Sequence, residues 1–196
     1  LDASHRILVP DLGLGGGGSV LSSDMNGDGQ EDFIFGLERN SFGGENAGAV
    51  FLVHGPISDD FSLESEYNAF WYGSAGSYAG YTMDNLGDIT GDGRSDIVIG
   101  AYEYDLNYPE GGAAYIIFGG ENQGDVSLSD ADVVLLGDAD ENLGFEVSSA
   151  GDVNADGFPD LAINAYRFDT TQRNAGRTFV FFGPIDSSLS LEQADI

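Results

Sequence analysis

The chain has 196 residues, 41% of them hydrophobic, which is enough to bury a sizeable core and excludes a disordered chain. Its 34 acidic residues against six arginines and no lysine give a formal net charge of −28, so we expect no nucleic-acid partner. It has no cysteine for a disulfide framework and no apolar run of 18 residues, so we expect no membrane insertion.

Short apolar runs, separated by glycine-rich or acidic segments, follow one another along the chain and predict β-strands. None of them shows the helical period of 3.6 residues, so the sequence predicts an all-β fold. The first run, residues 6–10, ends at Pro10. The later strands are expected at residues 33–36, 49–53, 69–73, 97–101, 113–119, 133–137, 143–147, 161–163 and 178–184.

An acidic loop recurs three times with the same residue types at the same positions. It reads DMNGDGQED from Asp24, DITGDGRSD from Asp88 and DVNADGFPD from Asp152, and these first aspartates are 64 residues apart. Oxygen-bearing side chains at alternate positions, with glycine at position 6, allow such a loop to curl around one hard cation. Three copies on one period indicate a repeat protein.

Two other interpretations of the acidic loop were weighed. An EF-hand needs a bidentate Glu at position 12, where this chain has the apolar residues Phe35, Ile99 and Ile163, so the EF-hand is rejected. Plain Asx turns without a metal are the other alternative. Three aspartates within nine residues would repel one another without a cation, so we expect calcium.

Each repeat unit is expected to hold four short antiparallel strands: A before the acidic loop, B after it, C in the Phe/Tyr-rich run, and D outermost. Four-stranded sheets at a fixed period are typical of β-propeller blades. The predicted divisions are an orphan outer strand in residues 1–12, blade 1 at 13–76, blade 2 at 77–140, and blade 3 at 141–196, which lacks its strand D.

Three blades are too few to close a ring, since propellers typically have about 4–8 blades. If two chains pair, the orphan strand of one chain can take the place of the strand that is missing from the third blade of the other, and no sheet edge stays unpaired there. We therefore expect a homodimer that forms one six-bladed ring, in which residues 6–10 of each chain complete the third blade of the other.

The units share a further frame around the acidic loop. It opens with Gly80-Tyr81 or Gly144-Phe145 and continues after the loop with Gly100-Ala101. This frame resembles the FG-GAP repeat, which is found in the seven-bladed β-propeller of integrin α-subunits and in many bacterial secreted proteins. Unit one departs from it with Gly16-Gly17 at the opening, and unit three departs with Asn164-Ala165-Tyr166 in the GAP segment.

The resemblance implies that each acidic loop binds Ca²⁺, which makes three sites per chain. The side chains at positions 1, 3, 5 and 9 and the backbone carbonyl at position 7 are the implied ligands. They are Asp24, Asn26, Asp28, Gln30 and Asp32 in the first loop, Asp88, Thr90, Asp92, Arg94 and Asp96 in the second, and Asp152, Asn154, Asp156, Phe158 and Asp160 in the third.

No catalytic arrangement emerges from the sequence. His5 and His54 have no counterparts in the other units, no cysteine nucleophile exists, and no GxSxG frame is present. We expect a non-enzymatic, calcium-binding module, extracellular or at the cell surface, for adhesion to a protein or glycan ligand. The alternatives are a propeller associated with a polysaccharide- or lipid-hydrolysing enzyme, and an architectural spacer of a large surface protein.

Overall fold

The structure is a computed structural model that describes residues 7–8, 18–57, 61–62, 66–105, 110–121, 124–168, 175–186 and 189–196. These residues form strands and two three-residue 3₁₀ helices, Leu128–Asp130 and Leu191–Gln193. The strands are β1 (Ile7–Leu8), β2 (Val20–Ser23), β3 (Asp32–Leu37), β4 (Ala49–Val53), β5 (Phe61–Ser62), β6 (Ala69–Tyr72), β7 (Met83–Gly87), β8 (Asp96–Ala101), β9 (Ala113–Ile117), β10 (Gly124–Ser127), β11 (Val133–Leu136), β12 (Leu143–Gly151), β13 (Asp160–Ala165) and β14 (Arg177–Phe181).

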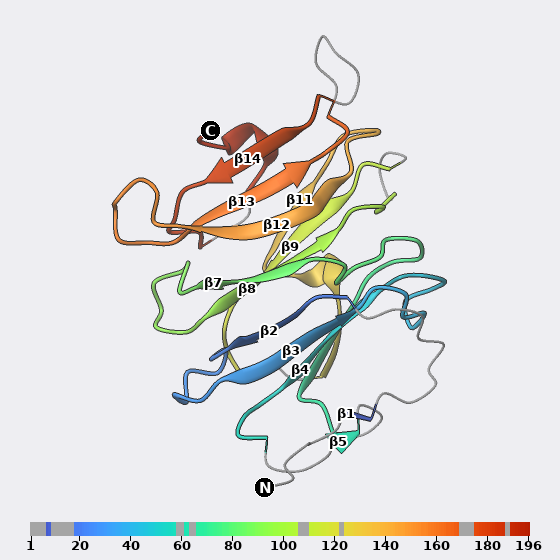
Figure 1. The fold of residues 1–196 in the computed structure, drawn as a ribbon, viewed down its shortest axis with the longest axis vertical. Coiled ribbons are helices and arrows are strands. Elements are labelled where there is room, and N and C mark those ends of the chain that lie inside the picture. The colour runs from blue at the N-terminus through green and yellow to red at the C-terminus, as the bar shows by residue number, and fades with distance from the viewer. Residues whose placement is uncertain are drawn as a thin grey trace, which may run out of the picture.

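Three antiparallel sheets follow one another along the chain and lie one above the next (Figure 1). Blade 1 has the strand order β2-β3-β4-β6, blade 2 has β7-β8-β9-β11, and blade 3 has β12-β13-β14. Within each blade the strands pair in the order A, B, C and D, as in the blades of a propeller. The predicted all-β fold built of propeller blades is confirmed.

Apolar side chains from facing sheets fill the two spaces between the blades. Ile34 and Trp71 of blade 1 pack with Tyr115 of blade 2 in one buried cluster. Ile116 of blade 2 packs with Phe181 of blade 3 in the other. Every residue of β8 and β9 is buried, because blade 2 is covered on both faces. This explains why the two central strands of blade 2 read as nearly continuous apolar runs and do not alternate.

The predicted strands 113–119 and 178–184 end earlier than expected, at Ile117 and Phe181. The next two backbone N–H groups leave the sheet and donate to side chains. The N–H of the first residue beyond strand C donates to an Asn or Asp side chain just before strand D. The N–H of the second residue donates to the last aspartate of the acidic loop. The first bond joins His54 N to Asn68 Oδ1, Phe118 N to Asp132 Oδ2, and Phe182 N to Asp195 Oδ2, each at 2.8 Å.

The sequence did not predict two strands, β5 and β10. Each lies between strands C and D of its blade in the sequence but pairs with the outer strand that precedes this blade. β10 lies between strands C and D of blade 2 and pairs in parallel with β6 of blade 1, with Val126 opposite Trp71. β5 lies at the corresponding place in blade 1 and pairs in parallel with β1, with Phe61 opposite Ile7. Ile7 and Trp71 are 64 residues apart in the sequence, so the two parallel pairs have the same place in the repeat.

At the edge of β14, the last residues of the chain begin to pair. Val180 N donates to Ile196 O at 3.0 Å, and Asp195 N donates to Val180 O at 2.8 Å. Ile196 therefore lies where Val133 begins strand D of blade 2, opposite Ile116. Within the part of the chain that the structure describes, no helix is long and apolar enough to cross a membrane.

Candidate metal-binding loops

The three acidic loops join strand A to strand B in each blade, and they project from the same end of the blades (left in Figure 1). They follow β2, β7 and β12, and each ends on the buried aspartate that begins the next strand. The structure therefore brings the five positions of each predicted site together within one loop. It also places the three loops in a row.

The aspartate at position 1 closes each loop through its carboxylate. In the first loop, Asp24 Oδ1 accepts hydrogen bonds from the backbone N–H groups of Gly27 at 2.9 Å and Asp28 at 3.1 Å, and Oδ2 accepts one from Gly29 at 2.9 Å. Asp88 accepts the same three bonds in its loop. Asp152 accepts two of them. The Asx turns that the sequence left open as an alternative are made by the next two oxygen-bearing side chains, because Asp28 N donates to Asn26 Oδ1 at 2.9 Å and Gln30 N donates to Asp28 Oδ1 at 2.8 Å.

The aspartate at position 9 is fully buried, at 0% exposure, in all three loops. One carboxylate oxygen accepts the backbone N–H of loop position 2, and the other accepts the second N–H beyond strand C. These bonds join Asp32 to Met25 at 3.1 Å and Gly55 at 3.0 Å, Asp96 to Ile89 at 2.9 Å and Gly119 at 2.8 Å, and Asp160 to Val153 at 2.8 Å and Gly183 at 3.0 Å. The aspartate thus ties the loop to strand C, a role that sequence reasoning missed.

The middle loop shows the electrostatic consequence of this burial. Desolvation raises the pKa of the Asp96 carboxyl to about 6, although the N–H groups of Gly119, Thr90 and Ile89 act to lower it. The nearby Asp92 carboxylate raises it further. A bound divalent cation would oppose both effects, because it favours the charged form.

The side chains at positions 3 and 5 lie next to each other at the exposed part of the loop. Asn26 Nδ2 donates to Asp28 Oδ2 at 3.2 Å, and Asn154 Nδ2 donates to Asp156 Oδ2 at 2.8 Å. Every predicted ligand atom is an oxygen, and Ca²⁺ prefers oxygen ligands. Across the described residues, no group of three or more Asp, Glu, His or Cys side chains is already gathered as a metal site. The assignment of the loop residues as ligands stays a prediction.

The side chain at position 7 links neighbouring loops, which the sequence did not indicate. A Cβ added at Gly27 would lie 3.2 Å from Cγ of Arg94, and one added at Gly91 would lie 2.9 Å from Cε1 of Phe158. Arg94 and Phe158 therefore each pack on position 4 of the preceding loop. The backbone adds a second link, because Ser95 N donates to Asp24 O at 3.1 Å.

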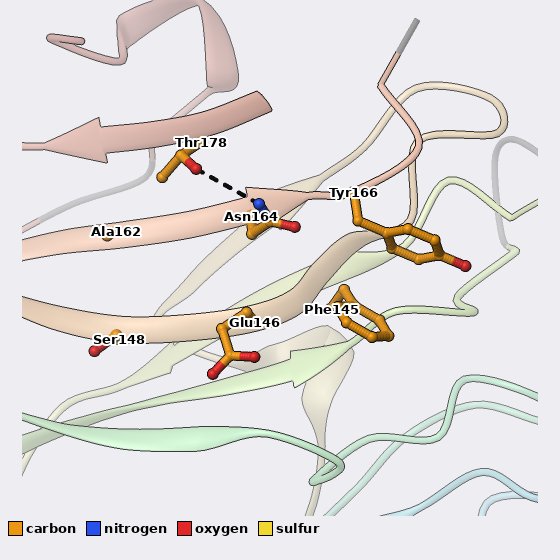
Figure 2. A pocket seen from close by; sticks show the side chains of 7 residues that line it. All are labelled: Phe145, Glu146, Ser148, Ala162, Asn164, Tyr166 and Thr178. Atoms are coloured by element: carbon orange, nitrogen blue, oxygen red, sulfur yellow. Dashed lines mark hydrogen bonds between the residues drawn. The ribbon is translucent and has the colours of Figure 1, made fainter. Parts of the chain in front are cut away.

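A row of aromatic rings lies at the opposite end of the blades, where strand A begins and strand B ends. We call Tyr78, Tyr102, Tyr81, Phe145 and Tyr166 the aromatic row. Successive ring centroids in this order are 5.8, 4.9, 5.8 and 4.5 Å apart. Tyr81 is 39% exposed and the other four are half-buried. Figure 2 shows Phe145 and Tyr166 side by side at this end of blade 3.

Two carboxylates act on Tyr102 in the aromatic row. Burial, together with the carboxylates of Glu103 and Glu38, raises the pKa of Tyr102 to about 12. The phenol is therefore neutral near pH 7 and can donate a hydrogen bond. In the sequence, the Gly80-Tyr81 and Gly144-Phe145 pairs mark the start of a repeat unit. Only the tertiary structure brings their rings together with those that follow strand B.

Repeat-equivalent four-stranded blades, each with an acidic loop between strands A and B, define this molecule as a repeat-type β-propeller module. The model of the FG-GAP repeat matches residues 79–117 and 144–181. The two matched segments run from strand A through the acidic loop to the end of strand C in blades 2 and 3. The chain therefore contains FG-GAP repeats, as its motifs predicted.

The chain is also similar to integrin α-subunits. Integrin alpha-PS2 of Drosophila melanogaster is 30% identical over 164 residues, which cover 78% of this chain and 12% of that protein. Integrin alpha-6 of Gallus gallus is 30% identical over 184 residues, or 93% of this chain and 15% of that protein. Phosphatidylinositol-glycan-specific phospholipase D of Bos taurus is 31% identical over 171 residues, or 83% of this chain and 20% of that enzyme. The chain thus spans no more than 20% of the length of these relatives.

Proposed function

We propose that this chain is a calcium-binding, integrin-like propeller module that acts outside the cell, where it binds a protein or glycan and so serves adhesion. The single observation that carries the proposal is the threefold acidic loop, in which repeat-equivalent residues make repeat-equivalent bonds in three successive blades. The similarity to integrin α-subunits supports the adhesive role. The role is one of binding and not of catalysis.

In this proposal calcium stabilises the blades. The loop oxygens at positions 1, 3, 5 and 9, with the carbonyl at position 7, hold one ion in each loop, and the ion supplies the positive charge that offsets mutual repulsion of the carboxylates. The same loops contact one another through Arg94 and Phe158. A filled loop therefore braces its own A–B hairpin and also the adjoining blade.

The aromatic row is the surface that we assign to ligand binding. Its rings are large, partly exposed, and contributed by loops and by the start of β12, which the rigid sheets hold in place. The net charge of −28 favours ligands that are neutral or basic. The row lies at the end of the blades away from the acidic loops, so calcium supports the binding surface without touching the ligand.

The test is a screen of glycans and extracellular-matrix proteins with the purified chain, with and without Ca²⁺. We expect at least one ligand whose binding is lost in chelator and is roughly tenfold weaker for Tyr81→Ser, the size of a small hot spot. The matched control is Phe42→Ser, since Phe42 is also exposed, at 63%, but lies on blade 1 outside the row. Binding that ignores calcium, or that falls equally in both variants, would contradict the proposal.

A second candidate function follows from one observation, the similarity to a phospholipase D that is specific for phosphatidylinositol glycans. By that analogy the propeller would accompany a lipid-hydrolysing domain in a longer chain. The full-length gene decides this question, because a catalytic domain encoded next to this segment would favour the enzymatic setting.

A further inference from the structure

The three acidic loops differ in the charge that they carry. The first loop has three aspartates and Glu31, which give a formal charge of −4, and the third has three aspartates, which give −3. The second has three aspartates and Arg94, so its formal charge is −2. Arg94 is the only basic residue in the sequence of the three loops. It stands at position 7, where the predicted metal ligand is the backbone carbonyl, so the side chain is available for another role.

The stem of the Arg94 side chain is confined between the first loop and the end of strand C in its own blade. A Cβ added at Gly27 would lie 3.2 Å from Arg94 Cγ, and one added at Gly119 would lie 2.6 Å from Arg94 Cβ. The backbone is held as well, because Ser95 N donates to Asp24 O of the first loop at 3.1 Å. A side chain that is already confined loses less conformational entropy when its end group binds a partner.

The guanidinium group of Arg94 contacts an oxygen that the predicted metal site also uses. Arg94 Nη1 lies 3.5 Å from Asp92 Oδ2, and Asp92 is the predicted ligand at position 5 of the second loop. The backbone N–H of Arg94 donates to Asp92 Oδ1 at 2.9 Å. One residue therefore contacts both oxygens of this carboxylate. Arg94 Nη1 also donates to Gly119 O at 3.5 Å, which holds the guanidinium beside the loop.

The corresponding oxygen has a different partner in the other two loops. In the first and third loops, Oδ2 of the position-5 aspartate accepts a hydrogen bond from Nδ2 of the position-3 asparagine, at 3.2 and 2.8 Å. Position 3 of the second loop is Thr90, whose hydroxyl donates to Asp88 Oδ1 at 3.4 Å. The position-5 carboxylate therefore meets a neutral amide in two loops and a full positive charge in the second.

The junction between the second and third loops shows that the space between two loops can be filled without charge. Phe158, at position 7 of the third loop, packs on Gly91, where a Cβ would lie 2.9 Å from Phe158 Cε1. Pro159 follows, and its Cγ lies 3.9 Å from a Cβ added at Gly87. Apolar contacts suffice at this junction, so packing alone does not explain the charge of Arg94.

We propose that Arg94 is a built-in counter-ion of the second loop, which makes this loop the weakest of the three calcium sites and the one that responds to changes in calcium concentration. The inference rests on the proposed calcium-binding function. Arg94 offsets part of the carboxylate charge when calcium is absent, and a calcium ion must compete with it for Asp92. Ligand charge is one of the properties that tune the affinity of calcium loops. Because Arg94 also packs on Gly27, the junction of blades 1 and 2 stays braced after the ion leaves.

Solvent limits the size of the effect. Both side chains of the ion pair are nearly half exposed, and such pairs contribute little to stability. Water and dissolved salt also weaken the repulsion between a guanidinium group and a divalent ion near the surface. We therefore expect Arg94 to weaken calcium binding to the second loop by roughly three- to tenfold.

Calcium titration of the chain by calorimetry at low salt tests the proposal. Arg94→Gln introduces the residue that the first loop has at position 7, and it should make the weakest binding step roughly three- to tenfold tighter. Arg94→Lys keeps the charge and should bind calcium within about twofold of the unchanged protein. Arg39→Gln removes the same charge at the opposite end of the blades, where Arg39 pairs with Glu38, and should have no such effect. Asp92→Asn removes the shared carboxylate and so identifies the step that belongs to the second loop.

A second readout separates a counter-ion from a side chain that only supports the fold. In chelator, Arg94→Gln should lower the melting temperature by roughly 1–4 °C, because the loop loses its positive charge. The same variant should bind calcium more tightly, whereas a loss of structural support would weaken both properties. Sodium chloride at about 1 M should reduce the difference in calcium affinity between the variant and the unchanged protein.

The possible failures can be told apart. The proposal fails if calcium binds but the step lost in Asp92→Asn is not the weakest one, if Arg94→Gln leaves that step unchanged, or if Arg39→Gln tightens it equally. Each of these results would leave calcium binding by the loops in place. An unchanged protein that binds no calcium would overturn the proposed function, and this inference with it.

Discussion

The aspartates of one acidic loop have the same chemistry but different surroundings. Asp156 is exposed and bonds only within its loop, whereas Asp160 is fully buried and accepts N–H groups from both the loop and the end of strand C. The sequence shows which residues repeat, and on that basis it assigned both aspartates to the metal. Only the structure separates a residue that holds the blade together from one that faces the loop surface.

We predict different effects of removing the charge at these two positions. Asp160→Asn turns an amide toward two buried N–H groups and should cost about 1–3 kcal/mol of unfolding free energy with or without calcium. Asp156→Asn should change the metal-free stability by less than about 0.5 kcal/mol. It should nevertheless weaken calcium binding. Urea unfolding in chelator and in calcium measures both effects. Equal metal-free losses for the two variants would contradict the assignment.

At the scale of elements, the central strands of each blade were predictable and the crossing strands were not. β3, β4, β8 and β9 are apolar runs buried on both faces, so composition alone reveals them. β10 has the sequence GDVS, with two exposed residues, and carries no strand signal. It becomes a strand because the edge of β6 offers unpaired backbone groups beside it.

The start of β10 can be tested with two glycines that differ only in backbone conformation. A Cβ at Gly124 or at Gly120 meets nothing within 4 Å, but only Gly124 has a positive φ, of 84°. We expect Gly124→Ala to lose about 1–2 kcal/mol of stability through strain at the strand start. Gly120→Ala should be neutral or stabilising by up to about 1 kcal/mol. Thermal unfolding of both proteins measures the difference, and an unstrained Gly124→Ala protein would show that β10 forms without this turn.

The parallel pairs also bear on the whole molecule. Because β1 pairs in parallel with β5 at the place in the repeat where β6 pairs in parallel with β10, we propose that Ile7–Leu8 is the outer strand of a blade that precedes blade 1. The outer side of blade 1 carries a buried aromatic cluster of Phe35, Phe51 and Phe70.

Calcium removal is the whole-molecule prediction. If each loop holds one ion at a free calcium concentration about 100 times its Kd, each contributes about 2.7 kcal/mol. Chelation should then lower the melting temperature by roughly 15–30 °C for three filled loops. Added salt should restore part of the loss by screening the carboxylates. Calorimetry in EDTA, with excess calcium re-added as the control, measures this shift. An unchanged melting temperature would contradict the proposal that bound calcium stabilises the blades.

The sequence by itself determined the repeat, its period, the blade strands and the acidic loops, because each of these is written in local residue patterns of fixed spacing. The tertiary structure decided what depends on residues that are distant in the sequence. It made Asp160 a buried tie, gathered the aromatic row, and turned β10 into a strand. It also showed that strand B of blade 2 needs glycine at residue 100, because the carbonyl of Gly144 in the next blade lies against it. These features follow from contacts between residues distant in the sequence, whose packing and burial no local pattern records.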